Sequence, residues 1–127
     1  YGFDDALYTM ARLLEILAAQ PRSATEVFAA LPDAVATPEL RVDFAEGMHH
    51  AFMEKFLAAT RFPDAQVSTI DGLRADFADG WGLVRASNTT PCLIIRFEAD
   101  DDAALRRVQE AFRRALLAIE PSLKLPF

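Results

Sequence analysis

Cysteine, histidine, basic charge and long apolar runs are all scarce in this sequence. A single cysteine, Cys92, excludes an internal disulfide, and its place in an apolar stretch predicts a buried thiol. No run approaches the roughly 18 apolar residues of a membrane-spanning helix. Lys and Arg number 13 against 19 Asp and Glu, so the net charge is −6, and the arginines form no block. Nucleic acid and membrane are therefore poor partners, and a reducing cytoplasm is the expected location.

The sequence has the size and composition of one globular domain. Its 127 residues are 52% hydrophobic and 25% charged. The first residues, "YGFDDALY", include no initiating Met and lack the basic flank and apolar core of a signal peptide. We therefore expect a piece of a longer protein.

Helical patterns dominate the first 31 residues. Apolar residues recur at three-and-four spacing from Asp4 to Ala19, which predicts an amphipathic helix. Ser23 and Glu26 have the spacing of a capping box and predict a second, short helix through Leu31. The stretch "LPDAVATPE", which contains two prolines, reads as a linker. It is the best candidate for a domain boundary, with residues 1–32 before it and 33–127 as the second part.

Strands and helices mix beyond the linker. "ELRVDF" alternates like a half-buried strand, residues 48–60 form a helical pattern, and the Asp71-Gly72 pair between "QVSTI" and "LRADF" is typical of a two-residue hairpin turn. "WGLVRAS" and "CLIIRFEA" follow, and a final helix begins after an aspartate run. The expected fold is α+β, a four-stranded antiparallel sheet with two helices on one face.

Three features offer weak sites for chemistry. His50 and Glu54 are four residues apart and could share a metal, but two ligands do not make a site. Asp100–Asp102 could bind magnesium, although a helix start already explains these carboxylates. Trp81 could stack on a sugar, but a place in the core beside a tight turn is the stronger expectation. No triad is supported, because the two histidines are adjacent on one helix.

The loop "RASNTTP" is the strongest candidate for a binding site. Arg85 offers a guanidinium fork that suits two oxygens of one phosphate. The side chains of residues 87–90 add an amide and three hydroxyls, and turning backbone N–H groups can form an anion-binding nest. The alternative is a turn whose small polar residues only satisfy its own backbone. The residues themselves leave these two interpretations balanced.

A family resemblance changes this balance. The run "GWGLVRASNTTPCLIIRFEADD", with the finish at "LPF", resembles the C-terminal domain of the α-D-phosphohexomutase family, and within it the bacterial phosphomannomutase/phosphoglucomutase group. "GFDDALYTMARLLEIL" resembles the close of the preceding, third domain. The resemblance implies that the C-terminal domain, similar in fold to the TATA-box-binding protein, makes up residues 33–127.

The resemblance also implies a function. The family's enzymes are isomerases of carbohydrate metabolism that interconvert hexose 1-phosphates and 6-phosphates, here of glucose or mannose, through a phosphoserine and a 1,6-bisphosphate intermediate, with Mg²⁺. The motifs "TASHNP", "DGDGDR" and "GEMSGH", which carry that chemistry in other domains, do not occur here. What the resemblance implies for this chain is a loop that binds the substrate's distal phosphate, with support from Arg96. The implied loop residues are Arg85, Ala86, Ser87, Asn88, Thr89 and Thr90.

Three hypotheses follow for the chain as a whole. The leading one is a mobile, phosphate-binding C-terminal domain that contains no catalytic residue, metal ligand or cofactor site, and whose partners are a phosphosugar and the other three domains of the enzyme. The second is a stand-alone interaction module that dimerises through its first helix, where Leu7, Leu14 and Leu17 form an apolar stripe. The third, an autonomous mutase, predicts turnover by this chain alone, and we expect none.

Overall fold

The computed structural model describes residues 4–127 and divides them into two compact units. The first unit ends at Asp33, and the second is Ala34–Phe127. This division falls within the predicted linker. Among the described residues, no helix has both the length and the apolar character needed to cross a bilayer.

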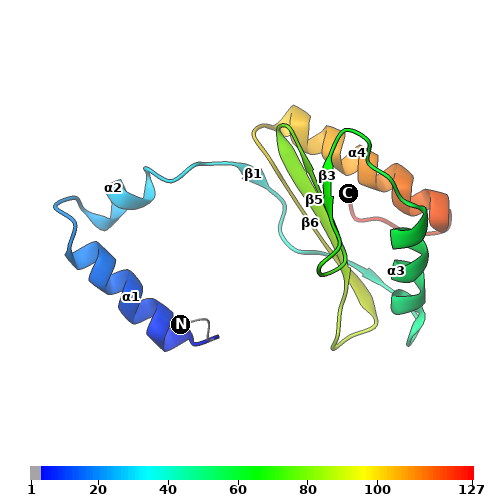
Figure 1. Ribbon diagram of the computed structural model, residues 1–127, viewed down its shortest axis with the longest axis horizontal. Coiled ribbons are helices and arrows are strands. Elements are labelled where there is room, and N and C mark those ends of the chain that lie inside the picture. Colours follow the sequence, from blue (N-terminus) through cyan, green and yellow to red (C-terminus); the bar gives the residue numbers. More distant parts are fainter. Residues whose placement is uncertain (1–3) are drawn as a thin grey trace. The chain divides into compact units, whose positions relative to one another are not determined.

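The first unit consists of two capped helices, α1 (Ala6–Ala18) and α2 (Ala24–Phe28) (Figure 1). The Asp5 side chain accepts the first-turn N–H of Tyr8 at 3.0 Å. The predicted capping box is confirmed, because Ser23 and Glu26 each bind the other's backbone N–H. The hydrogen bonds from the Ser23 side chain and backbone lower the pKa of Glu26. The second helix ends three residues before the predicted Leu31, since only one turn is hydrogen-bonded as α-helix.

The second unit is built on an antiparallel sheet. Its strands are β1 (Val35–Ala36), β2 (Leu40–Asp43), β3 (Gln66–Ser68), β4 (Leu73–Phe77), β5 (Gly80–Ala86) and β6 (Cys92–Ala99). Neighbours run in the order β1-β6-β5-β4-β3, and β2 also pairs with β6. The predicted number of four strands was wrong. The end of the predicted linker is itself a strand, because Val35 pairs with Ala99. β3 lies within the predicted run "QVSTI" and pairs with β4, so the hairpin partner that the sequence indicates is present as a strand of its own.

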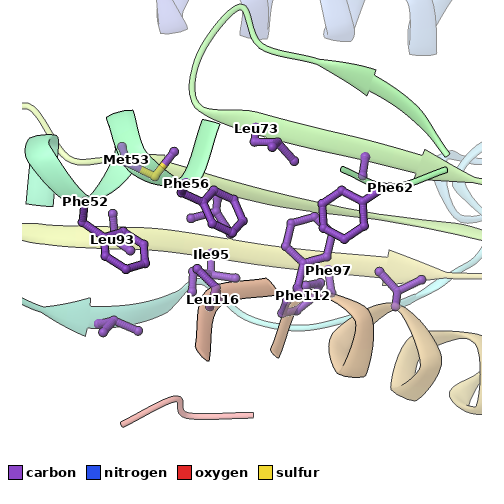
Figure 2. Close-up of a cluster of buried hydrophobic side chains, with 14 residues drawn as sticks. Phe52, Met53, Phe56, Phe62, Leu73, Leu93, Ile95, Phe97, Phe112 and Leu116 are labelled. Atoms are coloured by element: carbon purple, nitrogen blue, oxygen red, sulfur yellow. The ribbon is translucent and has the colours of Figure 1, made fainter. Parts of the chain in front are cut away.

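Two helices, α3 (Met48–Ala59) and α4 (Asp102–Ile119), pack on one face of this sheet, as predicted (Figure 1). Asp101 is the N-cap of α4, and its carboxylate accepts the Ala104 N–H at 2.8 Å. Figure 2 shows the core between the layers, where Phe112 of α4 meets Phe97 of β6 and Phe62. The face of α4 that packs on the sheet carries Ala104, Val108, Phe112 and Leu116, which are all buried. On α3, the first residue, Met48, is 56% exposed, because the core face of this helix begins at His49.

The turn before β4 approaches β5 closely. Gly72 has φ +77°, and a Cβ at this position would lie 2.2 Å from the carbonyl oxygen of Val84. Glycine is therefore required for both its backbone conformation and its contact. The predicted two-residue hairpin was too short, because residues 69–72 join β3 to β4. The close approach brings Asp71 beside Arg85, at 3.8 Å between carboxylate and guanidinium.

Candidate functional site

The loop of residues 87–91 joins β5 to β6 at the end of the sheet where α3 begins (Figure 1). The strands pair up to Ala86 and its partner Leu93. Beyond them, the Ser87 N–H donates to the Cys92 carbonyl at 2.9 Å, and the Cys92 N–H donates to the Thr90 carbonyl at 2.8 Å. The Cys92 side chain is fully buried, as predicted. These bonds give the loop a defined, closed conformation.

Ser87 lies at the centre of this loop, with only 7% of its surface exposed. Its Oγ accepts the N–H groups of Thr89 and Thr90 at 3.4 and 3.3 Å, and lies 3.0 Å from the Thr90 hydroxyl. The loop thus satisfies part of its own backbone, as the alternative interpretation of the sequence expects. The side chains of Asn88, Thr89 and Thr90 are exposed. An anion that approached the loop from solvent would therefore contact these three side chains first.

Arg85 closes the loop on the β5 side. Its side chain is 34% exposed and lies 3.8 Å from the Asp71 carboxylate, which is itself 70% exposed. An exposed pair at this distance contributes at most about 1 kcal/mol, so it does not fix the guanidinium in place. Arg85 is free to exchange this carboxylate for a phosphate oxygen.

Two further arginines share the sheet face that carries Arg85. Residues paired across antiparallel strands lie on the same face, and Ile94 of β6 pairs with Arg85 on one side and Arg41 on the other. Arg96 lies two residues from Ile94 and therefore on this face too, and it is exposed. The sheet thus places Arg85 and Arg96 as diagonal neighbours, about 7–8 Å apart at the backbone. The sequence reasoning missed Arg41, although the alternation of its strand marks it as outward-facing.

His49 is a second residue that the sequence reasoning missed. Its ring is 4% exposed, and Nε2 lies 3.1 Å from the carbonyl oxygen of Ser87. The sequence reasoning treats His50 as a possible metal ligand and mentions His49 only in excluding a triad. The helical period contains a signal for the burial of His49. The positions on the same helical face as His49 are Phe52, Met53 and Phe56, and all four residues are buried.

The weaker candidate sites have structural explanations in residues 4–127. No three His, Cys, Asp or Glu side chains of this range are grouped to hold a metal ion. Asp101 caps α4, as described above. The core position expected for Trp81 was wrong. Trp81 is half-buried, and its strand partner in β4 is Asp76. The central carbon of the Arg74 guanidinium lies 3.9 Å from the centroid of its ring. Trp81 faces the side of the sheet opposite the core, between Asp76 and Glu98 of the neighbouring strands, where a guanidinium can stack on its ring.

Two pockets of the second unit lie apart from the loop. One of about 550 Å³ lies between residues 59–64 and α4, and one of about 630 Å³ lies between β2 and residues 120–124. None of the loop residues 87–91 lines either of them. The loop therefore presents an open surface, suited to form one side of a site that other elements complete.

Comparison with known proteins identifies the family of this chain. Residues 38–115 match the model of the "Phosphoglucomutase/phosphomannomutase, C-terminal domain". A phosphomannomutase/phosphoglucomutase of Pseudomonas putida is 50% identical over the whole chain, and a phosphoglucomutase of Neisseria gonorrhoeae is 48% identical over 99% of it. In both cases the chain spans only 27% of the relative's length.

A solved structure supports the same assignment. The crystal structure of a phosphoglucomutase/phosphomannomutase family protein from Burkholderia thailandensis superimposes with a TM-score of 0.86 at 51% identity. The match covers all of this chain and 26% of the other. The chain belongs to the phosphoglucomutase/phosphomannomutase family and contains its C-terminal domain.

Proposed function

We propose that this chain is the substrate-phosphate-binding, mobile part of a phosphohexomutase. The observation that carries the proposal is the loop itself, an ordered turn with exposed polar side chains beside the sheet face of Arg85 and Arg96. A phosphate has several oxygens to satisfy, and a guanidinium, an amide and hydroxyls at one edge supply matching donors. Family membership supports phosphate binding over a turn that serves only its own backbone.

Each loop residue has a distinct part in the proposed site. Arg85 supplies the bidentate fork, and Arg96 supports it from the next strand. Asn88, Thr89 and Thr90 supply donors from the exposed side of the turn. The remaining two act mainly through the backbone, Ala86 with its peptide groups and Ser87 as the centre of the turn, because its hydroxyl already accepts two N–H groups.

The proposed substrates are hexose phosphates. In the intact enzyme, a hexose 1-phosphate or 6-phosphate of glucose or mannose binds by its non-reacting phosphate. Gripping that group orients the sugar hydroxyl at the other end towards the site of transfer. Phosphoryl transfer depends largely on such positioning, so the grip contributes to rate as well as to binding. The phosphoserine and the other three domains are proposed partners outside this chain.

Mg²⁺ is part of the proposed reaction, and we propose that its site lies in another domain of the enzyme. Residues 4–127 offer no group of three metal-ligating side chains, and the outward face of the loop is rich in hydroxyls and amides rather than carboxylates. A hard cation prefers several oxygen ligands of high charge. The residues described here therefore do not fit a magnesium site, and their part in the reaction is to bind and orient.

The division of the chain into two units supports the proposed mobility. The boundary between the units lies between Asp33 and Ala34, within residues 29–34, which form neither helix nor strand. We propose a hinge there. A substrate phosphate that Arg85 contacts only in the closed state shifts the population towards closure by the free energy of that contact.

Titration of the isolated chain with glucose 1-phosphate tests the proposed function. The expected result is shifts of the amide NMR signals of residues 85–90, with a Kd in the millimolar range or about 4 kcal/mol, because one phosphate grip acts without the other domains. Mannose 1-phosphate should behave alike, and uncharged glucose should leave these signals in place. Equal responses to glucose and to its phosphate would contradict a phosphate site.

An interaction module is the alternative function, and one observation favours it. The apolar side chains of α1 are exposed within the first unit, with Leu7 at 75% and Leu14 at 57%. A chain that dimerises through this helix should sediment as a dimer, and removal of residues 1–33 should return it to a monomer. The phosphate-binding proposal predicts that the amide shifts survive this removal.

A further inference from the structure

A buried histidine lies directly beneath the proposed phosphate-binding loop. His49 occupies the first turn of α3, with only 4% of its surface exposed, among Phe52, Met53 and Phe56. Burying a polar ring among apolar side chains costs free energy unless hydrogen bonds replace those made to water. The contacts of its two ring nitrogens therefore show what the ring does.

The two nitrogens of His49 differ in their contacts. Nε2 lies 3.1 Å from the carbonyl oxygen of Ser87, which only accepts, so the fitting tautomer carries its hydrogen on Nε2 and donates it to this oxygen. Nδ1 is buried and has no hydrogen-bond partner among residues 4–127. Among residues 4–127, the ring of His49 therefore makes one hydrogen bond, and its partner is the Ser87 carbonyl of the loop.

The bond fixes the peptide group between Ser87 and Asn88. A peptide is planar, and in the trans form its C=O and N–H point in opposite directions. The described peptide bonds include no cis form. Because His49 holds the Ser87 oxygen towards the helix, the Asn88 N–H of the same peptide points away from the helix. That direction is the exposed side of the turn.

We propose that His49 is a positioning residue that orients the Asn88 N–H for the substrate phosphate. The inference rests on the proposed function of the loop, because it names the element that keeps this donor outward. Ser87 transmits the effect to the rest of the turn, since its own N–H is held by Cys92 and its Oγ by Thr89 and Thr90. A free peptide at this point would rotate between orientations, and binding would then have to stop that rotation.

Three substitutions separate this role from simple packing. His49→Gln keeps a donor near the place of Nε2, whereas His49→Asn keeps an amide but places it near Nδ1, too short to reach Ser87. His49→Met fills the space without a donor. The ring of the neighbouring His50 lies 4.0 Å from the His49 ring between centroids, so the control is placed elsewhere on α3, as Glu54→Gln at an exposed position. Urea unfolding of each variant identifies any that fails to fold, and the Gln and Asn pair decides the result if His49→Met does.

Hydrogen exchange in the chain without ligand measures the positioning itself. Loss of one hydrogen bond of ordinary strength should raise the exchange rates of the Ser87, Thr89 and Thr90 amides by up to about tenfold in His49→Asn and His49→Met. His49→Gln and the Glu54→Gln control should stay near the wild-type rates. Equal exchange in His49→Asn and His49→Gln would overturn the inference.

Titration with glucose 1-phosphate then measures the consequence for binding. The Kd should rise by up to about tenfold in His49→Asn and return to within about twofold of wild type in His49→Gln. An unchanged Kd in His49→Asn overturns the positioning role while leaving the phosphate site intact. A wild-type chain that ignores the phosphosugar overturns the proposed function instead, and the exchange rates still show whether His49 orders the loop.

Discussion

Arg85→Ala in the full-length protein is expected to lower kcat/KM for glucose 1-phosphate by roughly 10- to 100-fold, the value of one or two charge-assisted hydrogen bonds. KM should rise because the contact binds the substrate, and kcat should fall because the same contact orients the sugar for transfer. The Asp71 carboxylate is too exposed and too distant to hold the guanidinium against a phosphate. Initial-rate kinetics at varied substrate concentration measure both parameters.

Two further substitutions make this result specific. Arg85→Lys keeps the charge but loses the planar fork, so it should recover only part of the loss. Arg106→Ala removes an exposed arginine of α4, on the helix-covered side of the sheet, and should leave both parameters unchanged. Wild-type kcat and KM in Arg85→Ala would refute the assignment of this loop.

Phe112→Ala is expected to lower the free energy of unfolding of the second unit by about 3–5 kcal/mol. Phe112 is fully buried, with ring centroids 4.7 Å from Phe62 and 5.4 Å from Phe97. Gly82 lies directly against its ring, where a Cβ would be 2.5 Å away, so the ring fills space that no neighbour can enter easily. Such a loss is a large part of the total stability of a domain of this size, about 5–15 kcal/mol.

Urea denaturation with equal slopes for wild type and variant measures this loss. Ile70→Ala, at a side chain that is 96% exposed, is the matched control and should change the unfolding free energy by less than about 0.5 kcal/mol. A Phe112→Ala loss below about 1 kcal/mol would contradict the place of this ring at the centre of the core.

Elements governed by local rules could be predicted from the sequence. The capping box at Ser23 and the acidic start of the last helix depend on hydrogen bonds within one turn, which the residue order specifies. The apolar stripe of α4 follows from the helical period alone. Positive φ at Gly72 is likewise a local property of the turn.

Elements that depend on distant partners could not be predicted in this way. β1 has only two residues, and they form a strand because Ala99, more than sixty positions away, completes the pairing. Trp81 stacks under Arg74 because the register of β4 and β5 places them on the open face. Sequence periodicity carries no information about such pairings.

The candidate site divides in the same manner. The residues of the loop are contiguous, so their types alone show a concentration of donors, but they suit an anion and a self-satisfied turn equally, and only the family resemblance favours the anion. The alignment of Arg85, Arg41 and Arg96 around Ile94 depends on the register of three strands. The contact of His49 with Ser87 depends on the packing of α3 beneath the loop.

The most direct measurement is a titration of the full-length protein with glucose 1-phosphate, followed at the amide signals of residues 85–90. The account predicts that these signals shift together and saturate, and that Arg85→Ala weakens the response by roughly 10- to 100-fold in Kd. Amide signals in this loop that stay in place while the protein turns over its substrate would contradict the central claim.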